Sequence, residues 1–151
     1  LAVETVTDTI EGYKFELGRG AVLQDGGDVT IIAVGMMVQM ALEAAKLLEA
    51  DGISARVIDM HTVKPLDTKL VEAAARETGA IVTTEEANIV GGLGGAVAEF
   101  VAENCPGPVV RHGVEDEFGR SGAAAAVLKA YGLTPEKIAE KARLAVAKKG
   151  K

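Results

Sequence analysis

The sequence has little sulfur and few aromatic rings. Among its 151 residues there is one cysteine, Cys105, and no tryptophan. A single cysteine excludes an intrachain disulfide and a cysteine-rich metal site, and it agrees with a cytoplasmic location. Cys105 stands between Asn104 and Pro106 with no histidine near it in sequence, so a catalytic thiol is not expected.

Long apolar runs and an excess of basic residues are also absent. No stretch approaches the ~18 consecutive apolar residues of a membrane-spanning helix, and the N-terminus lacks the charged-then-apolar pattern of a signal peptide. The net charge is −6, from 16 basic and 22 acidic residues. Binding to nucleic acid through phosphates needs clustered lysine and arginine instead. We therefore expect neither a membrane nor a nucleic acid as partner.

The hydrophobic residues, 48% of the chain, are almost all aliphatic, because only two tyrosines and three phenylalanines are present. The core must therefore be built from Ala, Val, Ile, Leu and Met, which suits helices packed on a sheet. A chain of this length has the size of one domain and can bury roughly two thirds of its unfolded surface.

A short β-branched run followed by an Ala-rich segment with helical period recurs after residue 28. Residues 29–34 are almost continuously apolar, as is typical of a strand covered on both faces, and residues 37–50 carry polar residues at helical spacing. Further strands are predicted at 55–60, 80–84 and 108–111. Further helices are predicted at 67–78, from 91–95 to about 103, from Ser121 to Gly132, and from Pro135 after the cap Thr134.

This alternation predicts parallel strands with right-handed crossovers, and hence a three-layer α/β/α domain. Ala21–Gln24 is a further short strand, which the turn at 25–27 joins to Val29. We expect it to be an antiparallel edge strand, so that the sheet has five strands and is mostly parallel. Residues 1–17 show no sustained period and are predicted to be a connector, which leaves 18–151 as the domain.

Polar residues cluster in the loops that follow the strands, where ligands and partners meet open α/β sheets. Both histidines, His61 and His112, fall in or at the start of these loops, near carboxylates such as Asp59, Glu85 and Glu115. Such residues could bind zinc or manganese, or they could cap loops and face a subunit interface. Their spacing matches no metal motif, which favours the second interpretation.

The glycine run at 91–95 follows a predicted strand and opens a predicted helix. Its backbone N–H groups could bind an anion, or the glycines could allow tight packing of helix on strand. The run matches neither GxGxxG nor GxxxxGK[ST]. The adjacent Glu85 and Glu86 should point to opposite sides of the strand end, so they are not expected to form an acid/base pair.

Four segments carry a resemblance to a known family. They read GDVTIIAVG at 27–35, DMHTVKPLD at 59–67, TEEANIVGGLG at 84–94, and GVEDEFGRSG at 113–122 followed by YGLT at 131–134. In order and spacing they resemble the C-terminal domain shared by transketolase, deoxyxylulose-phosphate synthase and the β subunits of 2-oxo acid dehydrogenases. The form HTVKPLD is more similar to the split transketolases, whose N- and C-terminal sections are separate chains.

The resemblance implies the C-terminal section of a transketolase. Such a section supports dimer assembly and shapes the substrate entrance for the transfer of a two-carbon ketol unit between sugar phosphates of the pentose phosphate pathway. Thiamine diphosphate and Mg²⁺ would be bound by other domains, because no GDG…N motif occurs in these residues. The implied partner is an N-terminal section with the diphosphate- and pyrimidine-binding domains, residues 1–17 would connect to the latter, and this chain alone would be inactive.

The resemblance also singles out residues. The synthase usually has an arginine where this chain has His61, and that arginine helps to bind a substrate phosphate, so His61 is expected to face the same entrance. The family often has a histidine at the position of Ala87, which argues against acid/base work by this loop. Catalytic, cofactor-binding and metal-binding residues are not expected. The implied interface and loop residues are Lys64, Glu86, Asn88, Gly91 and Gly92.

Two alternatives stay open. The chain could be the corresponding domain of deoxyxylulose-phosphate synthase or of a 2-oxo acid dehydrogenase β subunit, although His61 argues against both. It could also be a non-catalytic dimerisation or ligand-binding module that shares the fold alone. In the family a homo-oligomer is expected.

Overall fold

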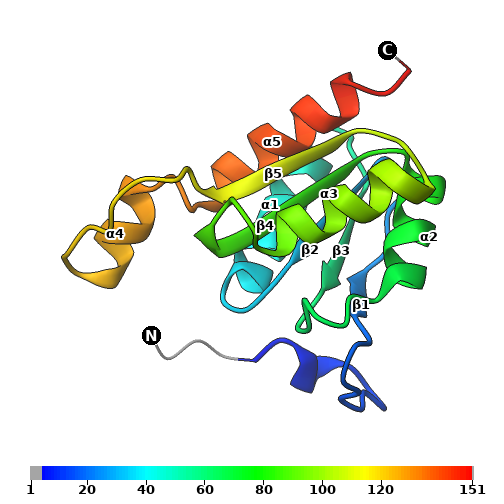
Figure 1. The fold of residues 1–151 in the computed structure, drawn as a ribbon, viewed down its shortest axis with the longest axis horizontal. Helices are drawn as coiled ribbons and strands as arrows, with labels where there is room; N and C mark the ends of the chain where they lie inside the picture. Colours follow the sequence, from blue (N-terminus) through cyan, green and yellow to red (C-terminus); the bar gives the residue numbers. More distant parts are fainter. Residues whose placement is uncertain (1–4, 151) are drawn as a thin grey trace.

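The computed structural model describes residues 5–150 and shows a central sheet with helices on both faces (Figure 1). A single 3₁₀ turn, η1, covers Thr7–Thr9. The strands are β1 (Ala21–Gln24), β2 (Val29–Ala33), β3 (Ala55–Asp59), β4 (Ile81–Asn88) and β5 (Val109–Val114). The helices are α1 (Met37–Ala50), α2 (Thr68–Thr78), α3 (Leu93–Asn104), α4 (Ala124–Ala130) and α5 (Pro135–Ala147).

The five strands lie in the order β1-β3-β2-β4-β5, and all but β1 run parallel to their neighbours. The predicted fold class and the antiparallel edge strand are thus confirmed. The strands joined by the turn at 25–27 are not neighbours, however, because β1 pairs with β3. Gly26 explains the path: a Cβ there would lie 2.3 Å from the carbonyl carbon of Ala55, so the chain crosses the start of β3 at this glycine.

Two strands are longer than predicted and one helix is shorter. β4 continues to Asn88 and β5 to Val114, and these two residues pair with each other beyond a register shift. The apolar runs end earlier than the strands, so the polar residues that follow concealed the extension. Helix α4 begins at Ala124, and Ser121 does not cap it.

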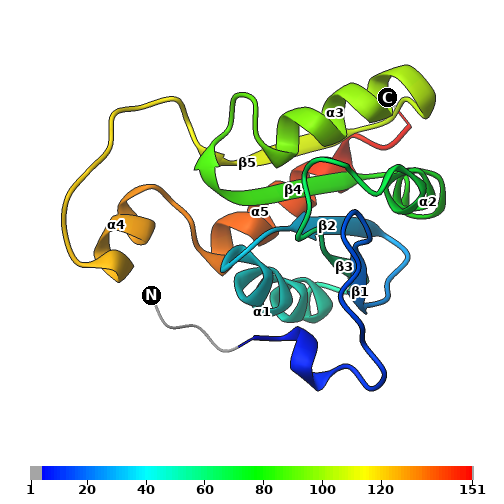
Figure 2. The same ribbon diagram turned by 60° about the horizontal axis from the view of Figure 1, so that its bottom comes forward.

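Each face of the sheet has its own apolar core. Figure 2 shows α1 and α5 on one side of the sheet and α2 and α3 on the other. Ile31 points into the core beneath α1 and α5, whereas its neighbour Ile32 points into the core beneath α2 and α3. Both side chains are fully buried, which explains why β2 reads as a continuous apolar run.

Side-chain caps and a glycine define the ends of α2 and the start of α5, as predicted for Thr134. Asp67 caps α2 by accepting a hydrogen bond from the N–H of Leu70, and Thr134 caps α5 by accepting one from Lys137. Gly79 ends α2 with a φ of 70°, a left-handed conformation that favours glycine. Asp67 also accepts a hydrogen bond of 3.0 Å from the N–H of Gly20, which ties the start of the domain to α2.

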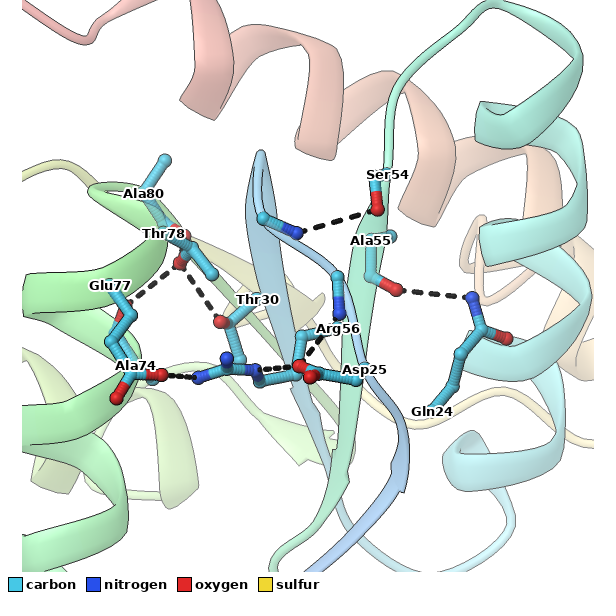
Figure 3. Close-up of polar contacts among 12 residues, drawn as sticks. Gln24, Asp25, Thr30, Ser54, Ala55, Arg56, Ala74, Glu77, Thr78 and Ala80 are labelled. Carbon is cyan, nitrogen blue, oxygen red and sulfur yellow. Dashed lines mark hydrogen bonds and ion pairs between the residues drawn. The ribbon is translucent and has the colours of Figure 1, made fainter.

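A group of ion pairs and hydrogen bonds stabilises the edge of the sheet at which the parallel strands begin (Figure 3). Arg56 on β3 forms ion pairs of 2.8 Å with Asp25 and 2.6 Å with Glu77 at the end of α2. Its hydrogen bond to Asp25 is the main reason why the pKa of that carboxyl lies below its ordinary value. Beside it, the buried hydroxyls of Thr30 and Thr78 lie 2.9 Å apart, linking β2 to α2.

Replacing Arg56 with methionine should lower the free energy of unfolding by about 1–2 kcal/mol, because the arginine side chain is only 12% exposed and serves two carboxylates. The matched control is Arg76→Met, which breaks the exposed pair between Arg76 and Glu72 and should cost no more than about 0.5 kcal/mol. Urea unfolding measures both variants. Equal losses of unfolding free energy in the two variants would contradict a larger contribution from Arg56 than from Arg76.

Candidate functional site

The loops at the carboxyl ends of β3, β4 and β5 form the candidate site. The structure places His61 two residues after the end of β3, in the loop that leads to α2. His112, which the sequence also assigned to these loops, lies inside β5 and is buried. The two histidines therefore have different roles, and His61 is the one located at the open edge.

His61 is half-buried and has a defined set of neighbours. Its Nδ1 lies 2.9 Å from the hydroxyl of Thr62, and its ring centroid lies 4.6 Å from that of Phe15. Nε2 is buried, and no hydrogen-bond partner for it exists among residues 5–150. A buried polar atom without a partner is uncommon, so this nitrogen is the atom of His61 with capacity for a ligand.

The predicted connector takes part in this arrangement. Phe15 comes from it, and the N–H of Gly18, the first residue after it, donates a hydrogen bond of 3.2 Å to the Thr62 hydroxyl. Gly18 has a φ of 78°, and a Cβ there would lie 2.9 Å from a side-chain carbon of Pro65. A glycine is therefore needed for the chain to approach this loop.

Asp59 ends β3 two residues before His61. It is buried, and this burial raises the pKa of the carboxyl above its ordinary value, while the nearby His61 acts in the opposite direction. The carboxylate therefore lies in a setting that disfavours negative charge.

Three of the predicted loop residues meet at one groove. Lys64, Gly91 and Gly92 line a groove of about 500 Å³ between the loop after β3 and helix α3, together with Leu66 and Phe100. Lys64 is exposed, and its peptide bond to Pro65 is cis. The sequence motif around 61–67 and the glycine run thus form the two walls of a single surface feature.

The glycine run binds an anion, and that anion belongs to the chain itself. The buried carboxylate of Glu85 accepts hydrogen bonds of 2.8 Å from the N–H groups of both Leu93 and Gly94 at the start of α3. A Cβ on Gly92 would lie 2.0 Å from a Glu85 carboxylate oxygen. Both interpretations of the run were therefore partly correct: the N–H groups hold a negative charge, and the glycines permit close packing.

Glu86 and Asn88 lie on the extended end of β4. Glu85 is buried and Glu86 exposed, which confirms that they point to opposite sides of the strand. The Asn88 side chain donates a hydrogen bond of 2.8 Å to Asp116 and accepts one of 2.7 Å from the N–H of Val90. Asn88 thus joins the loop after β4 to the loop after β5, whereas Glu86 and Lys64 remain candidates for contacts with another domain or subunit.

His112 joins β5 to the segment between α4 and α5. Its Nε2 lies 3.0 Å from the carbonyl oxygen of Gly132, and its Nδ1 lies 2.9 Å from the hydroxyl of Thr84. Because a carbonyl oxygen only accepts, Nε2 carries the proton and Nδ1 accepts from Thr84. Burial lowers the pKa of His112 below its ordinary value, although the hydrogen bond to Gly132 opposes the shift.

Comparison with known proteins shows the domain family. Residues 18–138 match the family described as transketolase, C-terminal domain. The chain belongs to the transketolase C-terminal domain family. A split-gene transketolase, solved as an inactive β4 tetramer, superposes with a TM-score of 0.89 at 49% identity over 97% of this chain and 47% of that one.

Sequence relatives of this transketolase C-terminal domain include split subunits. It is 48% identical to the 6-deoxy-6-sulfo-D-fructose transketolase subunit SqwH of Clostridium sp., over 85% of this chain and 40% of that protein. It is 44% identical to a putative transketolase C-terminal section of Methanocaldococcus jannaschii, over 91% of this chain and 43% of that protein. The chain thus spans less than half the length of these relatives.

Full-length synthases are similar as well. The 1-deoxy-D-xylulose-5-phosphate synthase of Symbiobacterium thermophilum is 48% identical over 83% of this chain, which corresponds to 20% of the synthase. Similarity in sequence alone therefore does not separate a transketolase from a synthase.

Enzymes of the transketolase family depend on thiamine diphosphate, so its fit to this domain can be tested. The N–H groups of Leu93 and Gly94 are hydrogen-bonded to Glu85, and this helix end does not fit a diphosphate. The described residues also include no cluster of three His, Cys, Asp or Glu side chains that could hold a metal ion. Over the same part of the chain, no helix is both long and apolar enough to cross a membrane.

Sequence reasoning missed the roles of Thr62, Gly18, Phe15 and His112. Thr62 and Gly18 are 44 residues apart, and their contact has no local signature. Glu85 had a signal that could have been used, since a carboxylate at a strand end followed by a glycine run is suited to capping the next helix.

Proposed function

We propose that this chain is the C-terminal section of a transketolase, which supports dimer assembly and forms part of the substrate entrance. The observation that carries the proposal is the buried Nε2 of His61, which lies at the carboxyl edge of the sheet without a partner in the described chain. A sugar phosphate oxygen could fill that place. The similarity to split transketolase subunits supports the same conclusion.

The partner in this proposal is an N-terminal section with the diphosphate-binding domain, and a pyrimidine-binding domain would precede residue 18. Thiamine diphosphate and Mg²⁺ would be held there, because in this domain the N–H groups at the start of α3 are already hydrogen-bonded to Glu85. When bound there, the cofactor would carry the two-carbon unit between donor and acceptor. The residues of this chain would bind and orient the phosphorylated end of the sugar. A cytoplasmic location is part of the proposal.

The substrate is proposed to be a sugar with a terminal anionic group. Relatives are named for 6-deoxy-6-sulfo-D-fructose and, in Phocaeicola vulgatus, for apulose-4-phosphate. Sulfonate and phosphate both offer oxygens that accept a hydrogen bond from an imidazole N–H. The pentose phosphate pathway therefore remains one proposed setting among related sugar conversions.

Reconstitution tests the function. The complete subunit that carries this chain is mixed with its N-terminal section, thiamine diphosphate, Mg²⁺, xylulose 5-phosphate and ribose 5-phosphate, and ketol transfer is measured. Activity supports transketolase. Condensation of pyruvate with glyceraldehyde 3-phosphate would select the synthase, decarboxylation of a 2-oxo acid would select the dehydrogenase β subunit, and inactivity in all assays would select the non-catalytic module.

Substitution of His61 with alanine should raise the KM for phosphorylated sugars about tenfold and change kcat less than about twofold, because a hydrogen bond to a charged group contributes ~1.5 kcal/mol or more. Steady-state kinetics on the reconstituted enzyme measures both constants. His61→Gln is the matched control, since its amide can still donate and should keep part of the affinity. An unchanged KM in the alanine variant would contradict a role in binding the phosphate.

A further inference from the structure

We propose that Thr62 is a positioning residue that fixes the tautomer of His61, so that His61 presents a protonated Nε2 as a hydrogen-bond donor to the substrate's anionic end. The inference rests on the proposed function, because it assumes that His61 faces a substrate. It assigns a task to the junction between the predicted connector and the domain, where Gly18 completes the arrangement.

The Thr62 hydroxyl has two neighbours, Gly18 and His61. A hydroxyl group has one hydrogen to donate and two lone pairs to accept. The N–H of Gly18 can only donate, so its contact of 3.2 Å occupies one lone pair of Thr62. The hydroxyl hydrogen then needs an acceptor, and in the described chain the neighbour within reach is Nδ1 of His61, at 2.9 Å.

In a neutral imidazole, one nitrogen donates a hydrogen bond while the other accepts one. When Nδ1 accepts from Thr62, the proton must be on Nε2. The opposite arrangement, with Nδ1 donating to Thr62, would leave the hydroxyl hydrogen of a buried threonine without an acceptor among residues 5–150. Complete pairing around Thr62 therefore selects the Nε2–H form.

In this form Nε2 of His61 carries a hydrogen that it can donate. This atom is buried and has no partner within the described chain, so the fold presents a donor without supplying its acceptor. A phosphate or sulfonate oxygen has the matching chemistry. Phe15 lies against the ring and is itself 64% exposed, so its side chain can move aside for a ligand while giving up little buried surface.

Gly18, directly after the predicted connector, helps to hold Thr62 in position. Gly18 reaches the Thr62 hydroxyl because it adopts a positive φ and has no Cβ that would overlap with Pro65. The segment around Gly18 thus helps to set the proton position on His61. Substrate binding would then depend on the seating of the connector as well as on His61.

The test combines spectroscopy with kinetics on the complete subunit assembled with its N-terminal section. The tautomer of His61 is read from the nitrogen chemical shifts and long-range couplings of ¹⁵N-histidine, with His61→Gln used for assignment. We expect the Nε2–H form in the native protein and in Thr62→Ser, and a mixture of both forms in Thr62→Val. The KM for the phosphorylated donor should rise about five- to tenfold in Thr62→Val and stay within about twofold in Thr62→Ser, with kcat unchanged in both.

The possible results separate the inference from the proposed function. Finding His61 as the Nδ1–H form in the native protein would overturn the inference, and so would a Thr62→Val variant that keeps both the native tautomer and the native KM. A native Nε2–H form combined with a KM that does not respond to His61→Gln or His61→Ala would leave the tautomer assignment standing and reject the role of His61 in substrate binding. Thr62→Ser is the control for misfolding, because this substitution also changes the size of the side chain but retains the hydroxyl.

Discussion

Replacing Gly92 with alanine should destabilise the domain by about 3 kcal/mol or more, among the largest effects of any single methyl group in this chain. The added Cβ would lie 2.0 Å from a carboxylate oxygen of Glu85. To relieve the overlap, Glu85 must leave the N–H groups of Leu93 and Gly94, or the start of α3 must shift. Either change breaks the hydrogen bonds between Glu85 and these N–H groups. The carboxylate and the N–H groups are then left without partners in an apolar surrounding.

Backbone strain does not contribute to this effect. Gly92 has φ −95° and ψ −155°, which alanine can adopt, so the whole cost comes from lack of space. Gly95 offers a matched control in the same helix, because a Cβ there would meet nothing within 4 Å. Gly95→Ala should therefore stabilise the domain by about 0.5–1 kcal/mol, through the better helix propensity of alanine.

Urea unfolding of the single and double variants checks the mechanism. If the cost of Gly92→Ala arises from Glu85, it should fall below about 1 kcal/mol when the substitution is made in a Glu85→Ala background, although Glu85→Ala is itself destabilising. An equal cost in both backgrounds would show that Glu85 is not the group displaced.

The parts of the fold that could be predicted are those that depend on local pattern. The apolar residues of β2 and the caps at Asp67 and Thr134 lie next to the elements that they specify. The neighbour of β1 could not be read in this way, because it depends on the chain crossing the start of β3 at Gly26. The end of β4 was hidden because Glu85, Glu86 and Asn88 are polar, while the pairing partner of this strand end is on β5.

The same distinction between local and long-range causes applies to the candidate site. The position of His61 at the carboxyl edge followed from its place after a strand, but its Thr62 and Gly18 environment depends on a contact across 44 residues. The buried His112 was the harder case, because its partner is a backbone carbonyl 20 residues away and a carbonyl has no sequence signature.

His112 should make the stability of the domain depend on pH. Burial holds its pKa below the ordinary value, with nearby Lys141 acting in the same direction and the Gly132 carbonyl and Glu115 opposing it. In the unfolded chain His112 takes up a proton near pH 6.5, whereas in the folded chain it does so only at lower pH. The unfolded state therefore binds more protons in this window, and the free energy of unfolding falls as the pH drops, by at most about 1.4 kcal/mol per pH unit.

The matched variant is His112→Gln, whose amide can donate to Gly132 but does not titrate. The difference in free energy of unfolding between native chain and variant, measured by urea unfolding from pH 7.5 to 5, should favour the native chain most at neutral pH and shrink as the pH falls. Asp59, whose pKa is raised, contributes stability that is lost as the pH rises through its own window, and this contribution cancels in the difference. Parallel curves for the two proteins would show that His112 is protonated equally in the folded and unfolded states, and the link between β5 and the α4–α5 segment would then not require a neutral imidazole.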